Sequence, residues 1–371
     1  MIIGTLTYHR ADNYGAVLQA YALCQYLREQ GYEAENIDYW PYHHAVVYKF
    51  WCWDKWEFHS SNWKGKIFYL LKFPSILLRS YKRKKNFDKF RKKKMKIASL
   101  RDSYDAVFYG SDTIWNRWNL NRFYTGFDSM YWGADSIKTK YRFSYAPSMG
   151  NVIEAEETLI QCQTYLRYFD KLSVREVQLR DKLEEWGVKD VQITVDPTLL
   201  LPKNIWDNLA SRRIIKRNYI LCYNLECSPV CKTMAENIGR EKNLPVVQMT
   251  ALVSKRHSSD IYDTAGPFEF LSLFKYASFV VTSSFHGCVF SIIFNKLFCF
   301  HSNVETERII SLLNSCGLSE RFVNSPDTLA MYNTIDYESV NKELDIKISA
   351  SRKFITECIQ IVEKGNGSYL R

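Results

Sequence analysis

The chain has 371 residues, of which 46% are hydrophobic and 24% are charged, so its length indicates about two domains and its apolar fraction excludes global disorder. The formal net charge is +10, but residues 64–96 contain 14 basic side chains and one acid, and the rest of the chain sums to −3. We therefore expect a nearly neutral body that carries one basic arm.

Short β-type runs alternate with helical runs through the first half of the chain. A strand expected at residues 2–7 precedes an amphipathic helix at 14–30, which Gly31 ends. The next strand is expected at 34–39. Further short strands are expected, each beside a helical stretch, at 105–109, 142–146 and 171–174. This alternation is typical of a parallel sheet with crossover helices.

The same alternation restarts after Asp196 and Pro197. Strands are expected at 219–224, 246–249, 279–282 and 297–300, helices at 230–241, 268–276 and 287–294, and a long amphipathic helix at 338–363. We predict an N-terminal domain (residues 1–201, with an insertion at about 40–100), a linker (202–217) and a C-terminal domain with the terminal helix (218–371). The expected fold class is α/β, with two Rossmann-like domains that face a cleft.

Neither a membrane-spanning helix nor a secretion signal is expected. No run of about 18 uninterrupted apolar residues occurs, and the N-terminal sequence lacks a basic segment followed by an apolar one. The ten cysteines form no CxxC pair, and the closest set matches no common zinc pattern. We therefore expect free thiols in a reducing compartment, no metal site and a cytoplasmic location.

Ligands of such sheets bind beyond the carboxyl ends of the strands, where this chain places several polar residues. After the first strand, Asn13, Tyr14 and Gly15 open a helix whose free N–H groups suit an anion, although an ordinary capped turn also explains them. Ser111 and Asp112 follow a later strand. Asp112 is a candidate either to receive a proton from a sugar hydroxyl or to cap the next turn.

Aromatic and basic residues add further candidates. Trp115, next to Asn116, is suited to stack on a sugar face or to pack in the core. Arg175 lies between an expected strand and the helix at 177–186, where a guanidinium grips a carboxylate or phosphate, or else pairs with Glu176. The sequence favours neither interpretation of Arg175 over the other.

The sharpest candidate is His286, which lies between a strand end and a helix opened by Gly287. An imidazole in that position moves protons near neutral pH, and Ser283 and Ser284 add hydroxyl groups. A purely structural histidine is the competing interpretation.

The basic arm, residues 64–96, follows a run that contains five of the ten tryptophans. A basic helix expected at 81–96 either covers the N-terminal domain as a solvated face or lies on an anionic membrane. Binding of single-stranded nucleic acid is much less favoured, so we predict no nucleic-acid partner.

Taken together, these motifs resemble the polysaccharide pyruvyl transferase family. The similar segments, in the order of the family, are Asn13 to Tyr21, Gly110 to Asn116, Tyr145 to Gly150, Ser173 to Glu176, Val195 to Thr198 and Ser284 to Ser291. The resemblance implies a two-domain GT-B-like enzyme that transfers the pyruvyl skeleton of phosphoenolpyruvate to a sugar as a cyclic ketal. Phosphoenolpyruvate is then a co-substrate, and no cofactor is implied.

The resemblance also implies roles for single residues. Arg175 and His286 would engage phosphoenolpyruvate and its proton transfers, with Asp112 at the acceptor. Many family members carry an arginine where this chain has Ser284. Either another cation binds the donor anion here, with Lys255, Arg256 and Arg308 as candidates, or the donor differs.

Acceptors in this family are often saccharides on a polyprenyl diphosphate. The resemblance therefore implies a cytoplasmic enzyme at the inner face of the plasma membrane, held there by the arm at residues 64–96. Two alternatives stay open: a GT-B-type glycosyltransferase that uses a nucleotide-sugar donor, and a non-catalytic saccharide- or lipid-binding protein.

Overall fold

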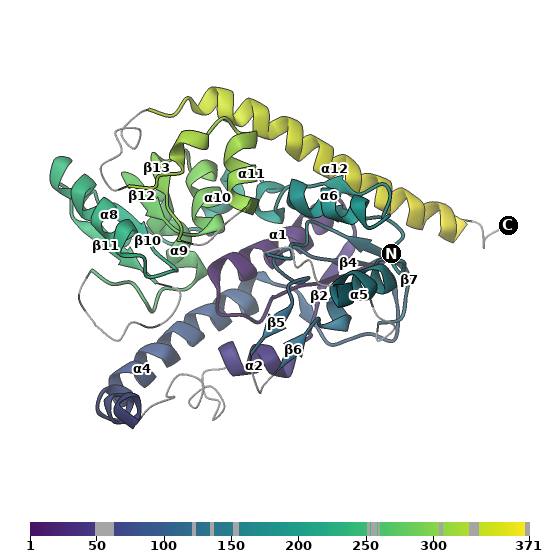
Figure 1. Cartoon of the computed structure of the whole chain (residues 1–371), viewed down its shortest axis with the longest axis horizontal. Coiled ribbons are helices and arrows are strands. Elements are labelled where there is room, and N and C mark those ends of the chain that lie inside the picture. The colour runs from purple at the N-terminus through teal and green to yellow at the C-terminus, as the bar shows by residue number, and fades with distance from the viewer. Residues whose placement is uncertain are drawn as a thin grey trace.

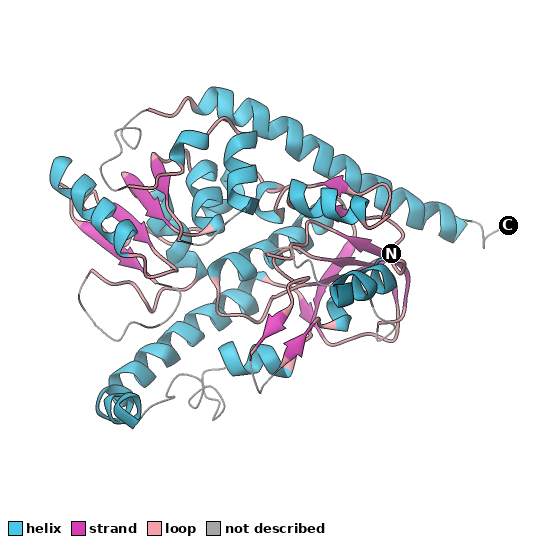
Figure 2. Ribbon diagram, viewed as in Figure 1, coloured by secondary structure: helices cyan, strands magenta, loops and turns pink. Residues whose placement is uncertain are grey.

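Two groups of strands, each flanked by helices, form the two halves of the molecule (Figures 1 and 2). The structure is a computed structural model that describes residues 1–48, 63–120, 124–133, 137–150, 156–250, 253, 258, 260–303, 307–325 and 334–367. Both sheets are parallel, as the alternation of strands and helices predicts.

The first half is built on a five-stranded parallel sheet in the order β3-β2-β1-β4-β7. Its strands are β1 (Ile2–Leu6), β2 (Glu33–Ile37), β3 (Ile97–Ala98), β4 (Tyr104–Tyr109) and β7 (Thr139–Ser144). The central strand β1 is almost wholly buried, because neighbours pair with both of its edges and helices cover the sheet. Helix α1 (Tyr14–Glu29) begins directly after the β1 loop, with Asn13 as its N-cap.

Shorter elements complete the first half. They are α2 (Tyr42–Tyr48), α4 (Trp63–Lys94), β5 (Trp118–Asn119), β6 (Thr125–Gly126), η1 (Ser129–Trp132), α5 (Glu156–Leu166), β8 (Ser173–Val174), α6 (Val177–Glu185), β9 (Gln192–Ile193) and η2 (Pro197–Leu199). Strands β5 and β6 pair antiparallel, whereas β8 and β9 pair parallel. The β8 end carries Arg175, and the turn before η2 carries Asp196.

The second half contains a four-stranded parallel sheet in the order β11-β10-β12-β13. Its elements are β10 (Ile220–Tyr223), α8 (Pro229–Glu241), β11 (Val246–Met249), α9 (Pro267–Lys275), β12 (Phe279–Thr282), α10 (Phe285–Ile293), β13 (Phe298–Phe300), α11 (Glu307–Ser315) and η3 (Ser319–Arg321). The predicted strands and helices are confirmed, with ends displaced by a few residues at most positions.

The segment 202–217, expected as a polar linker, instead contains helix α7 (Lys203–Leu209). Trp206 of this helix is fully buried, and its indole Nε1 donates to the carbonyl of Thr198 at 3.1 Å. The ring also packs edge-on against Tyr21 and Phe290, which belong to different halves. The buried side chains of Trp206, Leu209 and Ile215 therefore pack this polar segment into the core.

The terminal helix α12 (Tyr337–Gly367) starts at the second half and runs back over the first (Figure 1). Its Ser351 hydroxyl accepts from the backbone N–H of Val195 at 2.9 Å, and Glu357 forms an ion pair with Lys171. The predicted terminal helix is thus present, and it joins the two halves rather than packing on one.

Helix α4 turns its arginines inward and its lysines outward. Arg79, Arg83 and Arg91 are buried. The exposed side chains of the opposite face include Lys82, Lys85, Lys89, Lys92 and Lys93. This division fits the chemistry, because a guanidinium satisfies several buried acceptors at once, whereas an ammonium is strongly hydrated. The basic arm is therefore partly an internal element and only partly a solvated face.

The buried arginines of α4 connect both halves to the loop after β1. The guanidinium of Arg83 donates to the hydroxyl of Tyr14 at 2.7 Å and to the carbonyl of Asp263 at 3.1 Å. Arg79 forms an ion pair with the buried Asp263 carboxylate. Helix α4 thereby links the start of α1 to a loop of the second half.

Arg91 holds the β1–α1 loop in place. Its guanidinium donates to the carbonyls of His9, Arg10 and Ala11 at 2.8–3.0 Å, and to the carboxylate of Asp12 at 2.7 Å. Because one side chain satisfies four buried or half-buried acceptors, the loop depends on it for its shape.

We expect Arg91→Ala to lower the free energy of unfolding by about 3 kcal/mol, since the variant leaves these acceptors and Asp12 unpaired. Urea denaturation followed by circular dichroism measures the change. The exposed neighbour Lys92 provides a matched control, because Lys92→Ala should change the free energy of unfolding by about 0.5 kcal/mol or less. Equal losses in the two variants would contradict this account of Arg91.

Candidate active site

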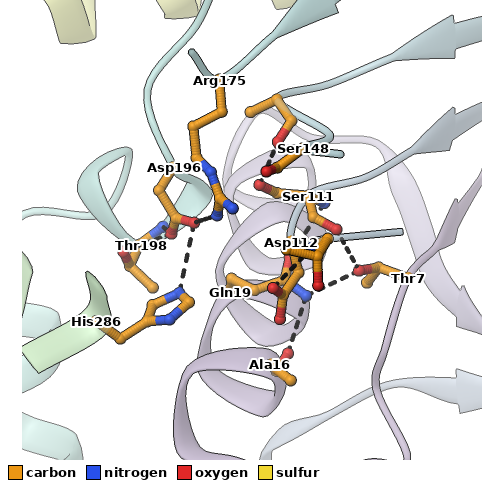
Figure 3. A network of polar contacts seen from close by, with 12 residues as sticks. Thr7, Ala16, Gln19, Ser111, Asp112, Ser148, Arg175, Asp196, Thr198 and His286 are labelled. Carbon is orange, nitrogen blue, oxygen red and sulfur yellow. Dashed lines mark hydrogen bonds and ion pairs between the residues drawn. The ribbon is translucent and has the colours of Figure 1, made fainter. Parts of the chain in front are cut away.

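The buried carboxylate of Asp196 lies where the two halves meet. Its Oδ2 atom is 3.1 Å from Nη1 of Arg175, in the first half, and 3.4 Å from Nε2 of His286, in the second (Figure 3). Its Oδ1 atom accepts from the backbone N–H and the hydroxyl of Thr198 at 3.0 and 2.7 Å. The structure therefore brings together Arg175 and His286, two of the three predicted catalytic residues.

Local sequence explains why Asp196 lies there. It is the N-cap of η2, and Pro197 occupies the first position of that turn, where no N–H is needed. Burial on its own would raise the pKa of Asp196, but His286, Arg175 and Thr198 together lower it well below its usual range. The carboxylate is thus charged at neutral pH and lies opposite the positive charge of Arg175.

His286 lies between the N-termini of helices α10 and α1. It is the second residue of α10, whose N-cap Ser284 accepts from the backbone N–H of Gly287 at 3.4 Å. A β-carbon on Gly15, at the start of α1, would lie 2.0 Å from His286 Nδ1. Only glycine permits this approach, so Gly15 makes room for the imidazole.

The Arg175 guanidinium has N–H groups that form no hydrogen bond with any described residue. Its side chain is buried, and the guanidinium lies 4.5 Å from the ring centre of Phe285. Within the described part of the chain, its Nε and Nη2 atoms have no hydrogen-bond partner. Nε is 3.8 Å from the carboxylate of Glu176, the partner considered from sequence, and burial raises the pKa of that carboxyl group.

A cavity of about 280 Å³ adjoins this cluster, at the lower end of the size range of ligand pockets. Arg175, Asp196, Phe285 and Arg308 contribute to its wall, together with residues of α11 and α12. Burial, followed by the nearby Arg175, lowers the pKa of Arg308. Two guanidinium groups thus share one enclosed space.

Ser111 and Asp112 occupy a tight turn after β4. The peptide between Gly110 and Ser111 is cis, and Asp112 has a φ of 69°. The Ser111 hydroxyl donates to the Ala146 carbonyl at 2.6 Å, and its N–H donates to Gln19 at 3.1 Å (Figure 3). Ser111 therefore holds two loops together, and its hydroxyl is fully buried.

Asp112 is partly exposed at the same turn, and its Oδ1 accepts from the N–H of Thr113 at 2.8 Å. This contact agrees with the capping interpretation and leaves the second carboxylate oxygen for another partner. Asn13 and Asn116 are also half-exposed, and Asn13 caps α1 by accepting from the N–H of Ala16.

Two predicted substrate-binding aromatics are core residues instead. The Trp115 side chain is fully buried, stacks on Trp132 at a ring-centre distance of 4.6 Å and donates to the Tyr131 carbonyl. Tyr14 is also buried, with its hydroxyl bonded to the Ala265 carbonyl at 2.8 Å. Neither ring has a face open to a sugar, because neighbouring aromatic residues cover both.

Ser283 and Ser284 have structural contacts as well. The Ser283 hydroxyl accepts from the backbone N–H of Leu225 at 2.9 Å, which fixes the loop after β10. Gly287 allows α10 to start close to β12, since a β-carbon there would lie 2.1 Å from the Thr282 hydroxyl. These residues therefore place His286 rather than line the cavity.

The two histidines of α2 belong to an aromatic cluster. Burial lowers the pKa of His43 to about 4 and of His44 to about 2, so both imidazoles are neutral at pH 7. The His44 ring packs edge-on against Tyr8 at 4.4 Å. Across the described ranges, no group of three His, Cys, Asp or Glu side chains is arranged to hold a metal ion.

Two parallel α/β sheets, with an arginine, a carboxylate and a histidine meeting between them, have the architecture of the GT-B-like class. The family model described as polysaccharide pyruvyl transferase matches residues 13–300, which is most of the chain. The chain therefore belongs to the polysaccharide pyruvyl transferase family, and it is a transferase. A comparison with curated proteins finds no match.

Solved structures support the fold. UDP-GlcNAc 2-epimerase from Neisseria meningitidis, bound to UDP-GlcNAc, is 8% identical with a TM-score of 0.50, and the match covers 97% of this chain and 100% of that one. The UDP-N-acetylglucosamine 2-epimerase from Rickettsia bellii is 10% identical, with a TM-score of 0.48 and coverage of 98% and 97%. At such low identity the first of these shows a shared GT-B-like architecture and nothing about the reaction.

Proposed function

We propose that this transferase moves the pyruvyl skeleton of phosphoenolpyruvate onto a saccharide, forming a pyruvate ketal and releasing phosphate. The observation that carries the proposal is the shared Asp196 carboxylate, which holds Arg175 and His286 together in a chain of this family. The unused donors of Arg175 suit the carboxylate or phosphate of the donor. Phosphoenolpyruvate acts as a co-substrate, and no other cofactor is needed.

The reaction requires a proton at C3 of the donor, so that C2 becomes an oxocarbenium-like centre. A saccharide hydroxyl attacks C2, phosphate leaves, and a second hydroxyl closes the ketal. One hydroxyl proton balances the proton added to C3, and the other departs with phosphate. His286 acts as the general acid or base, while Asp196 stabilises its protonated form. Asp112 orients or deprotonates the acceptor.

The test incubates purified protein with phosphoenolpyruvate and a panel of saccharide acceptors, and follows phosphate release. The alternative donor is a nucleotide sugar, because a shared fold does not fix the reaction. Thermal stabilisation by UDP but not by phosphoenolpyruvate would favour the alternative and contradict our proposal. Saccharide binding without turnover of any donor would identify a non-catalytic protein.

We further propose that the outward face of α4 places the enzyme on an anionic membrane, at the inner face of the plasma membrane, beside a polyprenyl-diphosphate-linked acceptor. Leu78 and Tyr81 are 69% and 54% exposed on that face, next to the lysines given above. Apolar side chains beside lysines suit the headgroup region. Among the described helices, none is both long and apolar enough to cross a bilayer.

Changing Lys85, Lys89 and Lys92 to glutamate together should reduce binding to anionic vesicles by about 100-fold or more, at roughly 1 kcal/mol for each lost lysine. Co-sedimentation with phosphatidylserine vesicles measures the partition, and added salt should weaken it. A matched control changes Lys232, Lys242 and Lys353, which are exposed elsewhere, to glutamate. Equal losses in both variants, or equal binding to neutral vesicles, would contradict a specific role of α4.

A further inference from the structure

The position of Ser284 supplies a helix cap and no positive charge. The Ser284 hydroxyl accepts from the N–H of Gly287, and its own N–H donates to the Thr282 hydroxyl at 3.1 Å. The arginine that many family members carry there is therefore missing, while Arg175 already shares its charge with Asp196. A donor with two anionic groups needs a second cation from another part of the fold.

Arg308 is in the right place to provide that cation. It is the second residue of α11, and α11 contacts both α6, which follows Arg175, and α10, which contains His286. Arg308 and Arg175 contribute to the wall of the same 280 Å³ cavity. Lys255 and Arg256, the other two candidates from the sequence, lie outside the described residues.

The surroundings of the two guanidinium groups favour an anion between them. Arg175 presents buried Nε and Nη2 atoms without hydrogen-bond partners in the described part of the chain. The adjoining cavity wall is largely apolar, with Val177, Ile193 and Leu312 among its residues. An anion bound in this cavity would be attracted by both guanidinium groups.

We infer that Arg308 and Arg175 together bind the anionic groups of phosphoenolpyruvate, and that Arg308 replaces the arginine missing at Ser284. The inference rests on the proposed function and adds a substrate-binding residue to it. The guanidinium is supplied by α11, which approaches from the second half, instead of by the turn before α10.

Isothermal titration of phosphoenolpyruvate into the full chain, without acceptor, tests this residue directly. Arg308→Ala and Arg308→Gln should each raise the dissociation constant by about 10- to 100-fold, the usual effect of losing a charge-assisted hydrogen bond. Arg308→Lys should raise it less, because the charge remains. The exposed Arg217 provides the matched control, and Arg217→Ala should bind as the wild type does.

A second experiment moves the arginine from position 308 to position 284. Adding Ser284→Arg to the Arg308→Ala variant should recover part of the lost affinity, whereas adding Ser284→Ala, which removes only the cap, should not. Thermal unfolding of each variant checks that the chain is folded, and Arg308→Gln keeps most of the side-chain volume if Arg308→Ala does not fold.

The outcomes separate the two proposals. A wild-type chain that binds phosphoenolpyruvate while Arg308→Gln binds it within twofold of the wild type overturns the role of Arg308 and leaves the proposed function in place. A wild-type chain that neither binds phosphoenolpyruvate nor releases phosphate from it overturns the proposed function, and the inference with it.

Discussion

Replacing His286 by alanine should lower the rate of phosphate release from phosphoenolpyruvate by about 10²- to 10⁴-fold, the usual contribution of a positioned general acid or base. The imidazole is the group that we propose for proton transfer, and its Nε2 lies 3.4 Å from the Asp196 carboxylate. Binding of phosphoenolpyruvate should change much less than turnover, because Arg175 remains. Steady-state phosphate release at saturating donor, together with calorimetric binding, gives the two quantities separately.

A second histidine provides the control for this prediction. His301 is buried in the second half, where its ring bonds to the Val323 carbonyl at 2.8 Å. His301→Ala should cost stability but leave turnover near the wild-type value at temperatures where the variant is folded. If both alanine variants lose turnover in proportion to their melting temperatures, His286 has a structural role and the assignment is wrong.

Asp196→Asn should remove most activity and also lower the free energy of unfolding by about 3–5 kcal/mol. The variant leaves Arg175 and His286 facing each other without the carboxylate that both contact, at a position that is fully buried. Urea denaturation at pH 7 measures the loss. Asp207, which pairs with Lys275 near the surface, is the matched control, and Asp207→Asn should cost about 1 kcal/mol or less.

The loss of stability in Asp196→Asn should depend on pH. The pKa of Asp196 in the folded chain lies below its value in the unfolded chain, ordinarily about 3.9. Its contribution to stability is therefore fully present above that ordinary value and is lost as the pH falls toward the folded-state pKa. The stability difference between wild type and Asp196→Asn should shrink below about pH 4. A difference that keeps growing below about pH 4 would contradict the assigned charge.

The sequence predicts the elements well because their ends are marked locally. Asn13 caps α1, Gly31 follows it, and Pro267 and Ser284 open helices of the second half. Motifs at the strand ends likewise indicate Arg175 and His286 as site residues. Periodicity and capping are short-range properties, so a single sequence is enough to reveal them.

Other features depend on contacts between distant residues. Asp196 is within a recognised motif, but its role comes from partners 21 and 90 residues away, and no local pattern indicates them. The burial of the α4 arginines could be predicted from the spacing of residues along the helix, although a count of charges does not indicate it. Arg79, Arg83 and Arg91 share one helical face with Phe87 and Phe90, whereas the exposed face is rich in lysine. The burial of Trp115 follows from its stacking on Trp132, which only the folded chain reveals.

The close approach of Gly15 to His286 shows what the contact between the halves contributes to the site. Gly15 and Asp196 belong to one half and His286 to the other, so the pairing of Asp196 with His286 forms only where the halves meet. Trp206 and helix α12 contact both halves as well, so the geometry of this cluster depends on the whole interface and not on either sheet alone.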